Sequence, residues 1–211
     1  MNRVIFLIDG FNLYHSICDI SYRLNIPCLK WLDINAFCSS FLSNVGGGAN
    51  LEKIYYFSAY AYHLGDADIL KRHAKYIECL ESTGVEPILG VFKPKKVRCS
   101  KCNRIFIKHE EKATDVGIAV KLLEVLSNKD CETVVLITGD TDIIPAIETT
   151  NRMFPNNQIL MAFPFGRKNE EFMGIAPRSF KIHVDSYKNN QFPDPVVLLD
   201  GTIIAKPLVW Y

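Results

Sequence analysis

Acidic residues follow directly after a strongly apolar stretch in the second half of the sequence. Residues Val134–Ile137 have no polar side chain to meet water, which predicts a strand buried on both faces. Gly139, Asp140 and Asp142 end this strand, and ligands bind at the carboxyl ends of strands in open α/β sheets. Carboxylates this close repel each other unless a cation lies between them or water covers both. The pattern therefore predicts either a cation site or an Asp140 cap on a helix that begins near Ile143.

A second apolar strand ends in a similar way near the start of the chain. Residues Arg3–Ile8 are apolar after the arginine, and Asp9 and Gly10 follow at once. Asn12 comes three residues after Asp9, in the first turn of a helix whose apolar side chains recur with helical spacing. Its carboxamide could cap backbone N–H groups or hold a ligand oxygen near Asp9.

A further carboxylate, Asp115, lies at the start of an apolar helix over residues 116–126. The helix dipole stabilises an acid in the first turn, which is one explanation of this residue. The other is that Asp115 points into the same cleft as Asp9 and Asp140. The choice depends on whether the two predicted strands are neighbours in the sheet.

Charged residues also precede this helix. Lys112 lies about one helical turn before Asp115 and could pair with an acid or reach a phosphate. Glu110 and Glu111 are consistent both with charges near a helix cap and with metal ligands. The spacing alone leaves these alternatives open.

Carboxylates from three segments converge if the two strands are adjacent. They are Asp9, Asp115, Asp140 and Asp142. Oxygen ligands of this kind suit Mg²⁺ or Mn²⁺, which activate water and neutralise charge on phosphorus, so the pattern favours phosphodiester hydrolysis. The sequence has no Walker lysine motif and no GxGxxG. An aspartyl phosphatase would require DxD after the first strand, where the chain reads DGFN.

The rest of the chain alternates strands with helices. Strands are expected over residues 53–61, 85–92, 158–163 and 179–184, and helices over residues 33–43, 66–83 and 143–153. This alternation predicts an α/β fold with a mainly parallel central sheet and helices on both faces. Three glycines at 46–48 lack the lysine and Ser/Thr of a phosphate loop and predict a flexible connection.

Composition places the chain among globular proteins. Its 211 residues are 48% hydrophobic, which is enough for one large domain, and the net charge of +1 indicates no polyanionic partner by itself. Seven cysteines, an odd number, are scattered through apolar segments, and no signal peptide or membrane-spanning run is evident. We therefore expect reduced thiols, a cytoplasmic location and no membrane partner.

Residues 93–109 form a basic insertion. Seven lysines and arginines occur between residues 93 and 108 without one acid. Cations in such a cluster gain affinity for a phosphate backbone by releasing counterions, although a solvated basic loop is the alternative. The side chains expected to guide a nucleic acid are Lys95, Lys96, Arg98, Lys101 and Arg104.

The same insertion contains a CxxC motif. Cys99 and Cys102 have the spacing of a zinc knuckle, and His109 follows as a third ligand of a structural Zn²⁺ site. No fourth ligand is apparent nearby, so it would come from elsewhere in the fold, from a second chain or from water. Free thiols and redox activity are the alternatives.

The tail at residues 189–211 differs from the preceding 1–188 domain. Asp200 and Gly201 between two apolar runs predict a two-residue β-hairpin turn. This apolar hairpin either closes the core of its own chain or adds to a neighbour's sheet edge, which would make a homodimer.

Three motifs together resemble the NYN domain, a branch of the PIN-like nucleases. They are Asp9–Asn12 (DGFN), Glu111–Asp115 (EKATD) and Thr138–Asp142 (TGDTD), within residues 3–184. The resemblance implies a three-layer PIN-like α/β/α sandwich and Mg²⁺- or Mn²⁺-dependent cleavage of RNA. It also implies a role for each acid and its neighbours: metal ligands at Asp9, Asp115, Asp140 and Asp142, a supporting Asn12, a phosphate contact from Lys112 and a basic CxxC insertion.

Two functions of different classes follow. The first is a metal-dependent endoribonuclease that hydrolyses RNA at the aspartate cluster. The second is a non-catalytic regulatory protein that retains the fold and binds RNA or a protein through the insertion and the tail. The presence of all four acids favours the enzyme, because a scaffold has little reason to keep repelling carboxylates together.

Overall fold

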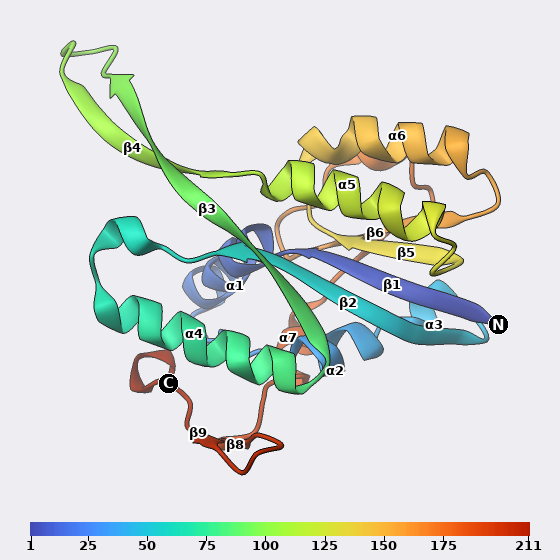
Figure 1. Cartoon of the computed structure of the whole chain (residues 1–211), viewed down its shortest axis with the longest axis horizontal. Helices are drawn as coiled ribbons and strands as arrows, with labels where there is room; N and C mark the ends of the chain where they lie inside the picture. Colours follow the sequence, from blue (N-terminus) through green and yellow to red (C-terminus); the bar gives the residue numbers. More distant parts are fainter.

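A seven-stranded sheet forms the centre of the protein in a computed structural model that describes residues 1–211 (Figure 1). The strands follow the spatial order β4-β3-β2-β1-β5-β6-β7, and all neighbours are parallel except β3 and β4. The strand bounds are β1 (Asn2–Asp9), β2 (Ala49–Ala59), β3 (Val85–Arg98), β4 (Ile105–Lys112), β5 (Thr133–Ile137), β6 (Gln158–Phe163) and β7 (Phe180–Lys181). The predicted mainly parallel α/β sheet is confirmed.

Helices cover both faces of this sheet (Figure 1). The α-helices are α1 (Gly10–Leu24), α2 (Ile34–Ser39), α3 (Leu42–Val45), α4 (Ala67–Ser82), α5 (Thr114–Ser127), α6 (Ile144–Met153) and α7 (Val184–Asn189). Short 3₁₀ turns are η1 (Tyr62–Leu64), η2 (Thr141–Ile143), η3 (Glu170–Phe172) and η4 (Leu208–Trp210). No helix has the length and apolar character needed to cross a membrane.

The two central strands belong to both halves of the core. Successive side chains of a strand point to opposite faces, so Val4, Phe6 and Ile8 of β1 pack with α1, α2 and α4. Ile5 and Leu7 point the other way and pack with α5 and α6. This explains the continuous apolar runs of β1 and β5, because neither strand has a face in contact with water.

The expected helix over residues 33–43 is two shorter helices. Asp33 caps α2 by accepting a hydrogen bond from the backbone N–H of Ala36 at 3.0 Å. At the other end, the Ser40 hydroxyl donates to the carbonyl of Phe37 at 2.7 Å, and α3 then starts again at Leu42. A side chain that satisfies a terminal carbonyl favours the end of a helix, and this was not evident from the apolar spacing.

Strands extend through much of the basic insertion, for which no strand was predicted. The antiparallel strands β3 and β4 pair from Val91–Lys112 out to Arg98–Ile105 and form a ribbon that projects beyond the helices (Figure 1). Its high charge is not typical of a strand, and the residues that favour a strand are few there: Val97 in β3 and Ile105–Ile107 in β4. Charged side chains suit a ribbon that is exposed on both faces.

The C-terminal tail forms the predicted hairpin with a longer turn. Strand β8 (Val196–Val197) pairs with β9 (Ile203–Ile204) in antiparallel fashion. The predicted two-residue turn is wrong: Leu198 donates its N–H to the Thr202 carbonyl at 2.8 Å, and Gly201 adopts a positive φ of 86° between them.

The inner side of the tail packs on the domain of the same chain. Val196 and Ile204 are buried in the same core as α1, α2 and α4. Trp210 packs against Trp31, with ring centroids 5.9 Å apart, and against Tyr76. The tail therefore closes its own core, and the homodimer stays a prediction.

The first residue of α1 lies very close to β2. A Cβ atom on Gly10 would lie 2.5 Å from the carbonyl oxygen of Phe57 and 2.8 Å from Cζ of Tyr56. Real Cβ atoms essentially never approach other atoms this closely, so only glycine fits without a shift of backbone. The glycine thus lets α1 begin immediately after Asp9.

We expect Gly10→Ala to destabilise the fold by about 1–3 kcal/mol in urea denaturation, the usual cost of overpacking. This loss outweighs the helix propensity of up to ~1 kcal/mol that alanine gains over glycine. Gly47→Ala is the matched control, because a Cβ there meets no atom within 4 Å. Equal stability of Gly10→Ala and the wild type would contradict the close approach.

Candidate active site

The carboxyl ends of β1 and β5 bring two acidic segments together. The strands are parallel neighbours, with Ile8 opposite Ile137, so Asp9 and the Thr138–Asp140 segment leave the sheet side by side. The buried Thr138 hydroxyl donates to Oδ2 of Asp9 at 3.0 Å and accepts the N–H of Asp140 at 3.1 Å. One threonine thus links the first acid to the backbone of the second.

Asn12 links the same two segments from the helix side. Its backbone N–H donates to Oδ1 of Asp9 at 2.9 Å, so Asp9 caps α1. Its side-chain Oδ1 accepts the N–H of Gly139 at 3.1 Å. The sequence left two roles for the Asn12 carboxamide, capping a backbone N–H or holding a ligand oxygen. The structure shows that it accepts a backbone N–H, which belongs to Gly139 after β5 and not to α1.

Asp140 and Asp142 lie on the turn after β5. Oδ1 of Asp140 accepts the N–H of Asp142 at 3.0 Å and caps η2, so the capping interpretation is confirmed for a short 3₁₀ turn. The carboxylate of Asp142 is exposed. A Cβ on Gly139 would overlap the carbonyl oxygen of Arg167, so the loop after β6 packs directly against this turn.

Asp115 lies in the first turn of α5 and is electrostatically coupled to the other acids. Its pKa is raised to about 6, first by burial and then by the charges of Asp140, Asp9, Glu111 and Asp142. Asp115 therefore opens a helix, and its charge is coupled to the charges of the other acids. That its side chain points into a shared cleft stays a prediction.

The pKa of Asp9 is raised as well. Burial is the largest cause, and the charge of Asp140 adds to it. Hydrogen bonds from the N–H of Asn12 and the hydroxyl of Thr138 act in the opposite direction, because they stabilise the charged carboxylate. The protein thus buries an acid whose charged form is disfavoured, and it provides no cationic partner.

The four acids fit a hard divalent cation by their chemistry. They offer oxygen donors only, and none of them forms an ion pair with a lysine, arginine or histidine. No three His, Cys, Asp or Glu side chains lie close enough to enclose an ion by themselves. Mg²⁺ is usually held by one or two carboxylates together with waters and phosphate oxygens, and these acids supply ligands of that kind.

Two residues at this site were not identified as such from the sequence. Thr138 was predicted only as part of a motif. A hydroxyl between a buried strand and a Gly-Asp pair is nevertheless a signal that it links Asp9 to the backbone of Asp140. Glu111, which the sequence left ambiguous, accepts a hydrogen bond from the Thr114 hydroxyl and raises the pKa of Asp115. Glu111 therefore belongs to the rim of the acidic site.

Lys112 pairs with an acid instead of facing the carboxylate cluster. Its Nζ lies 3.0 Å from Oε2 of Glu110, and Nζ of Lys95 lies 3.0 Å from the same oxygen. Lys108 is the third lysine near this carboxylate, at 3.9 Å. The remaining predicted cations are exposed on the ribbon or its turn and form no ion pair: Lys96, Arg98, Lys101 and Arg104.

The predicted third zinc ligand is far from the two cysteines. Cys99 and Cys102 lie in the turn of the ribbon, where N–H groups of Cys102 and Lys101 lower the pKa of the Cys99 thiol. His109 lies four residues along β4 from Ile105, roughly 13 Å at the usual rise of a strand. The three side chains therefore form no common site, and zinc binding by the two cysteines stays a prediction.

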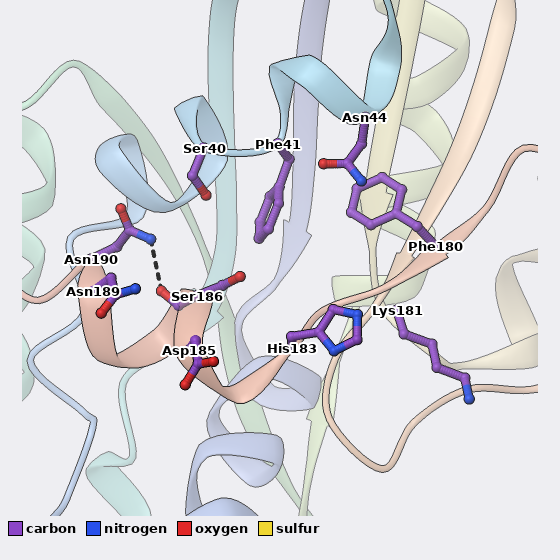
Figure 2. A pocket seen from close by; sticks show the side chains of 10 residues that line it. All are labelled: Ser40, Phe41, Asn44, Phe180, Lys181, His183, Asp185, Ser186, Asn189 and Asn190. Carbon is purple, nitrogen blue, oxygen red and sulfur yellow. Dashed lines mark hydrogen bonds between the residues drawn. The ribbon is translucent and has the colours of Figure 1, made fainter.

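A separate cavity lies away from the acids, between α2, α3, β7 and α7 (Figure 2). Its volume is about 320 Å³, and its floor includes the rings of Phe41 and Phe180. No predicted site residue lines it. The lining residues are Ser40, Phe41, Asn44, Phe180, Lys181, His183, Asp185, Ser186, Asn189 and Asn190.

Comparisons with known proteins identify a domain family and a similar fold. Residues 3–182 match the family model of the NYN domain. The fold is similar to the crystal structure of a protein of unknown function from Vibrio parahaemolyticus, with 20% identity, a TM-score of 0.55, and coverage of 87% of this chain and 94% of that one. MurG from Acinetobacter baumannii is more distant, with 10% identity, a TM-score of 0.39, and coverage of 92% and 43%. No curated protein matches the sequence.

We expect Asp115→Asn to raise the melting temperature in EDTA near neutral pH. Above its pKa of about 6, the Asp115 charge destabilises the folded state, because partial burial disfavours the charge and the other acids repel it. Water screens part of this cost, so we expect a gain of about 2–4 °C, the shift that ~1 kcal/mol produces in a chain of this size.

The gain should shrink as the pH falls from about 6 to about 4, because Asp115 then becomes protonated in the folded and finally in the unfolded state. Asp130→Asn serves as the control, since Asp130 precedes β5 at the opposite end of the same strand. A variant that is no more stable than the wild type near pH 7.5 would contradict the repulsion.

Proposed function

The chain belongs to the NYN-domain family of the PIN-like nuclease superfamily, and on this basis we propose that it is a metal-dependent endoribonuclease that hydrolyses RNA phosphodiester bonds. The observation that carries the proposal is the electrostatic coupling of Asp115, in the first turn of α5, with Asp9, Asp140 and Asp142, which follow the adjacent parallel strands β1 and β5. A cluster of unpaired carboxylates is costly for a fold, and this cost is offset when a cation binds.

The four acids would hold Mg²⁺ or Mn²⁺. When bound, such an ion supplies Lewis-acid chemistry, which lowers the pKa of an attacking water and neutralises charge on the phosphate. The buried Asp9 is oriented by Thr138 and Asn12, so its carboxylate keeps a defined position. Asp115 and Asp142 are exposed and remain accessible to the phosphate backbone of a substrate.

The projecting ribbon would guide the RNA toward these acids. Its unpaired cations, Lys96, Arg98, Lys101 and Arg104, lie on the strands and turn that lead outward from the sheet. Neutralised phosphates release counterions, so each such contact contributes affinity that decreases as salt increases. The paired Lys95 and Lys112 would contribute less, because Glu110 already neutralises part of their charge.

We expect wild-type protein to cut a labelled structured RNA with Mg²⁺ or Mn²⁺ but not with EDTA, and Asp140→Asn to lose this activity. The loss should be at least about 100-fold, comparable to the loss of one charge-stabilising group in an enzyme site. The control Asp130→Asn should cut like the wild type, and both variants should show native circular dichroism. A matched single-stranded DNA tests the choice of substrate.

Retained cleavage by Asp140→Asn would contradict the proposed site. If the well-folded, metal-supplied wild type cut neither nucleic acid but bound RNA, the result would favour the non-catalytic regulatory function instead. These two outcomes differ, because the first leaves an enzyme with another active site and the second leaves no enzyme.

We expect the double variant Lys101→Gln, Arg104→Gln to bind single-stranded RNA more weakly in EDTA. The slope of log K against log salt should decrease in magnitude by about 0.7 for each lost phosphate contact. Lys129→Gln is the control, because Lys129 is exposed near the opposite end of the sheet, before β5. An unchanged slope in the double variant would show that the turn of the ribbon does not contact phosphates.

A further inference from the structure

Four rings from four different elements form a continuous cluster between the acids and the ribbon. Phe11 of α1 meets Phe92 of β3 edge to face, with centroids 5.6 Å apart. Phe92 in turn contacts His63 of η1 at 4.3 Å. His63 and His109 of β4 are stacked, at 4.6 Å and an interplanar angle of 20°. All four side chains are only partly buried, so ring surface remains exposed.

One end of this ring cluster adjoins the acidic site. Phe11 lies two residues after Asp9. Phe92 is directly opposite Glu111 in the ribbon, and Glu111 is one of the charges that raise the pKa of Asp115. Residues opposite each other in an antiparallel pair project from the same face, so Phe92 and Glu111 share one face of the ribbon.

The same face continues outward with cations. By alternation it carries the pair Pro94–His109, and then Lys96 and Arg98. Neither Lys96 nor Arg98 forms an ion pair. Along this face, from the sheet outward, Glu111 and the rings of Phe92 and His109 come first, and the unpaired cations Lys96 and Arg98 follow.

The other face of the ribbon has a different character. It carries lysines 93, 95, 108 and 112, and three of them lie within 3.9 Å of the Glu110 carboxylate. The lysine charges there are partly neutralised, and Phe106 is an isolated ring without an aromatic contact. Only the face with the ring cluster therefore combines stacked rings with unpaired cations.

The two histidines stack ring on ring in the middle of this cluster. The pKa of His63 is lowered by burial and by its neighbour His109, since two imidazolium ions stacked at this distance would repel. Nδ1 of His63 is buried and has no hydrogen-bond partner in the protein. Such an unmet polar atom is normally satisfied by ordered water or a ligand, because leaving it unmet costs free energy.

We propose that the ring cluster of Phe11, His63, Phe92 and His109 is a stacking subsite for an unpaired base of single-stranded RNA. This base would lie next to the phosphodiester group that the acids cleave. This inference rests on the proposed function. Lys96 and Arg98 then hold the phosphates on the outer side of that base. An exposed ring surface accepts the face of any base, while a base inside a duplex is already stacked and paired, so the subsite selects single strands without selecting sequence.

The test measures binding without cleavage. Fluorescence anisotropy in EDTA follows a labelled single-stranded RNA of about 12 nucleotides, within the ~4–16 nucleotides of known single-strand sites, and the same strand in a duplex. A set of the same strands carries one abasic nucleotide at successive positions. We expect the wild type to bind the single strand more tightly than the duplex and to lose about tenfold in affinity when the abasic position meets the rings.

His109→Ala should bind the intact strand about tenfold more weakly than the wild type does, the same loss that the abasic nucleotide causes. Its affinity should no longer depend on the abasic position, because the stacking partner is gone. His109→Phe should restore binding, since it keeps a ring but not a hydrogen-bonding edge. Phe106→Ala is the matched control, as it removes a ring from the opposite face of the same ribbon. Circular dichroism and melting temperatures verify that each variant is folded.

Wild-type binding that responds to no abasic position would overturn the proposal, and this outcome requires no variant. Equal affinity of His109→Ala and the wild type for the intact strand would also overturn it. Failure of the subsite is distinct from failure of the proposed function: RNA cleavage with no ring-dependent binding rejects only the subsite, whereas ring-dependent binding without cleavage rejects only the nuclease.

Discussion

Repulsion between carboxylates at the ends of β1 and β5 is the constraint on which this structure depends. Asp9 is buried, Asp115 has a raised pKa, and neither acid has a cationic partner. Neutral groups hold the acids in place instead, because Thr138 and Asn12 each bridge the two strand ends through a hydrogen bond. Such an arrangement stores an unfavourable interaction that a divalent cation would relieve.

The scaffold around these strand ends supports this arrangement in specific ways. Both strands are buried on two faces, so a one-residue shift in register would move each apolar side chain into the opposite half of the core, against neighbours that it does not fit. Gly10 lets a helix begin against β2 directly after Asp9, and Gly139 admits the Arg167 carbonyl against the second turn. The central strands and the turns that follow them thus position the acids, while the β3–β4 ribbon projects beyond the helices.

The central strands and the acids were predictable because their signals are local. Fully apolar runs over residues 3–8 and 134–137 indicate buried parallel strands, and a carboxylate after each indicates a shared site. The ribbon was not predictable in the same way, since a segment with seven cations is not typical of a strand. The register of the ribbon places His109 opposite Pro94 and away from the cysteines, and this register could not be inferred from the sequence. The ring cluster joins residues 11, 63, 92 and 109, which only the tertiary structure brings together.

The most direct test of the central claim is calorimetric titration of Mn²⁺ into the metal-free protein and into Asp9→Asn. We predict a saturable site in the wild type that is lost in Asp9→Asn, although that variant stays folded, because Asp9 is the most buried of the coupled acids. The Asp130→Asn protein, altered at the other end of β5, should bind like the wild type. Equal Mn²⁺ binding by Asp9→Asn and the wild type would contradict the account, as would a folded wild-type protein that binds no Mn²⁺.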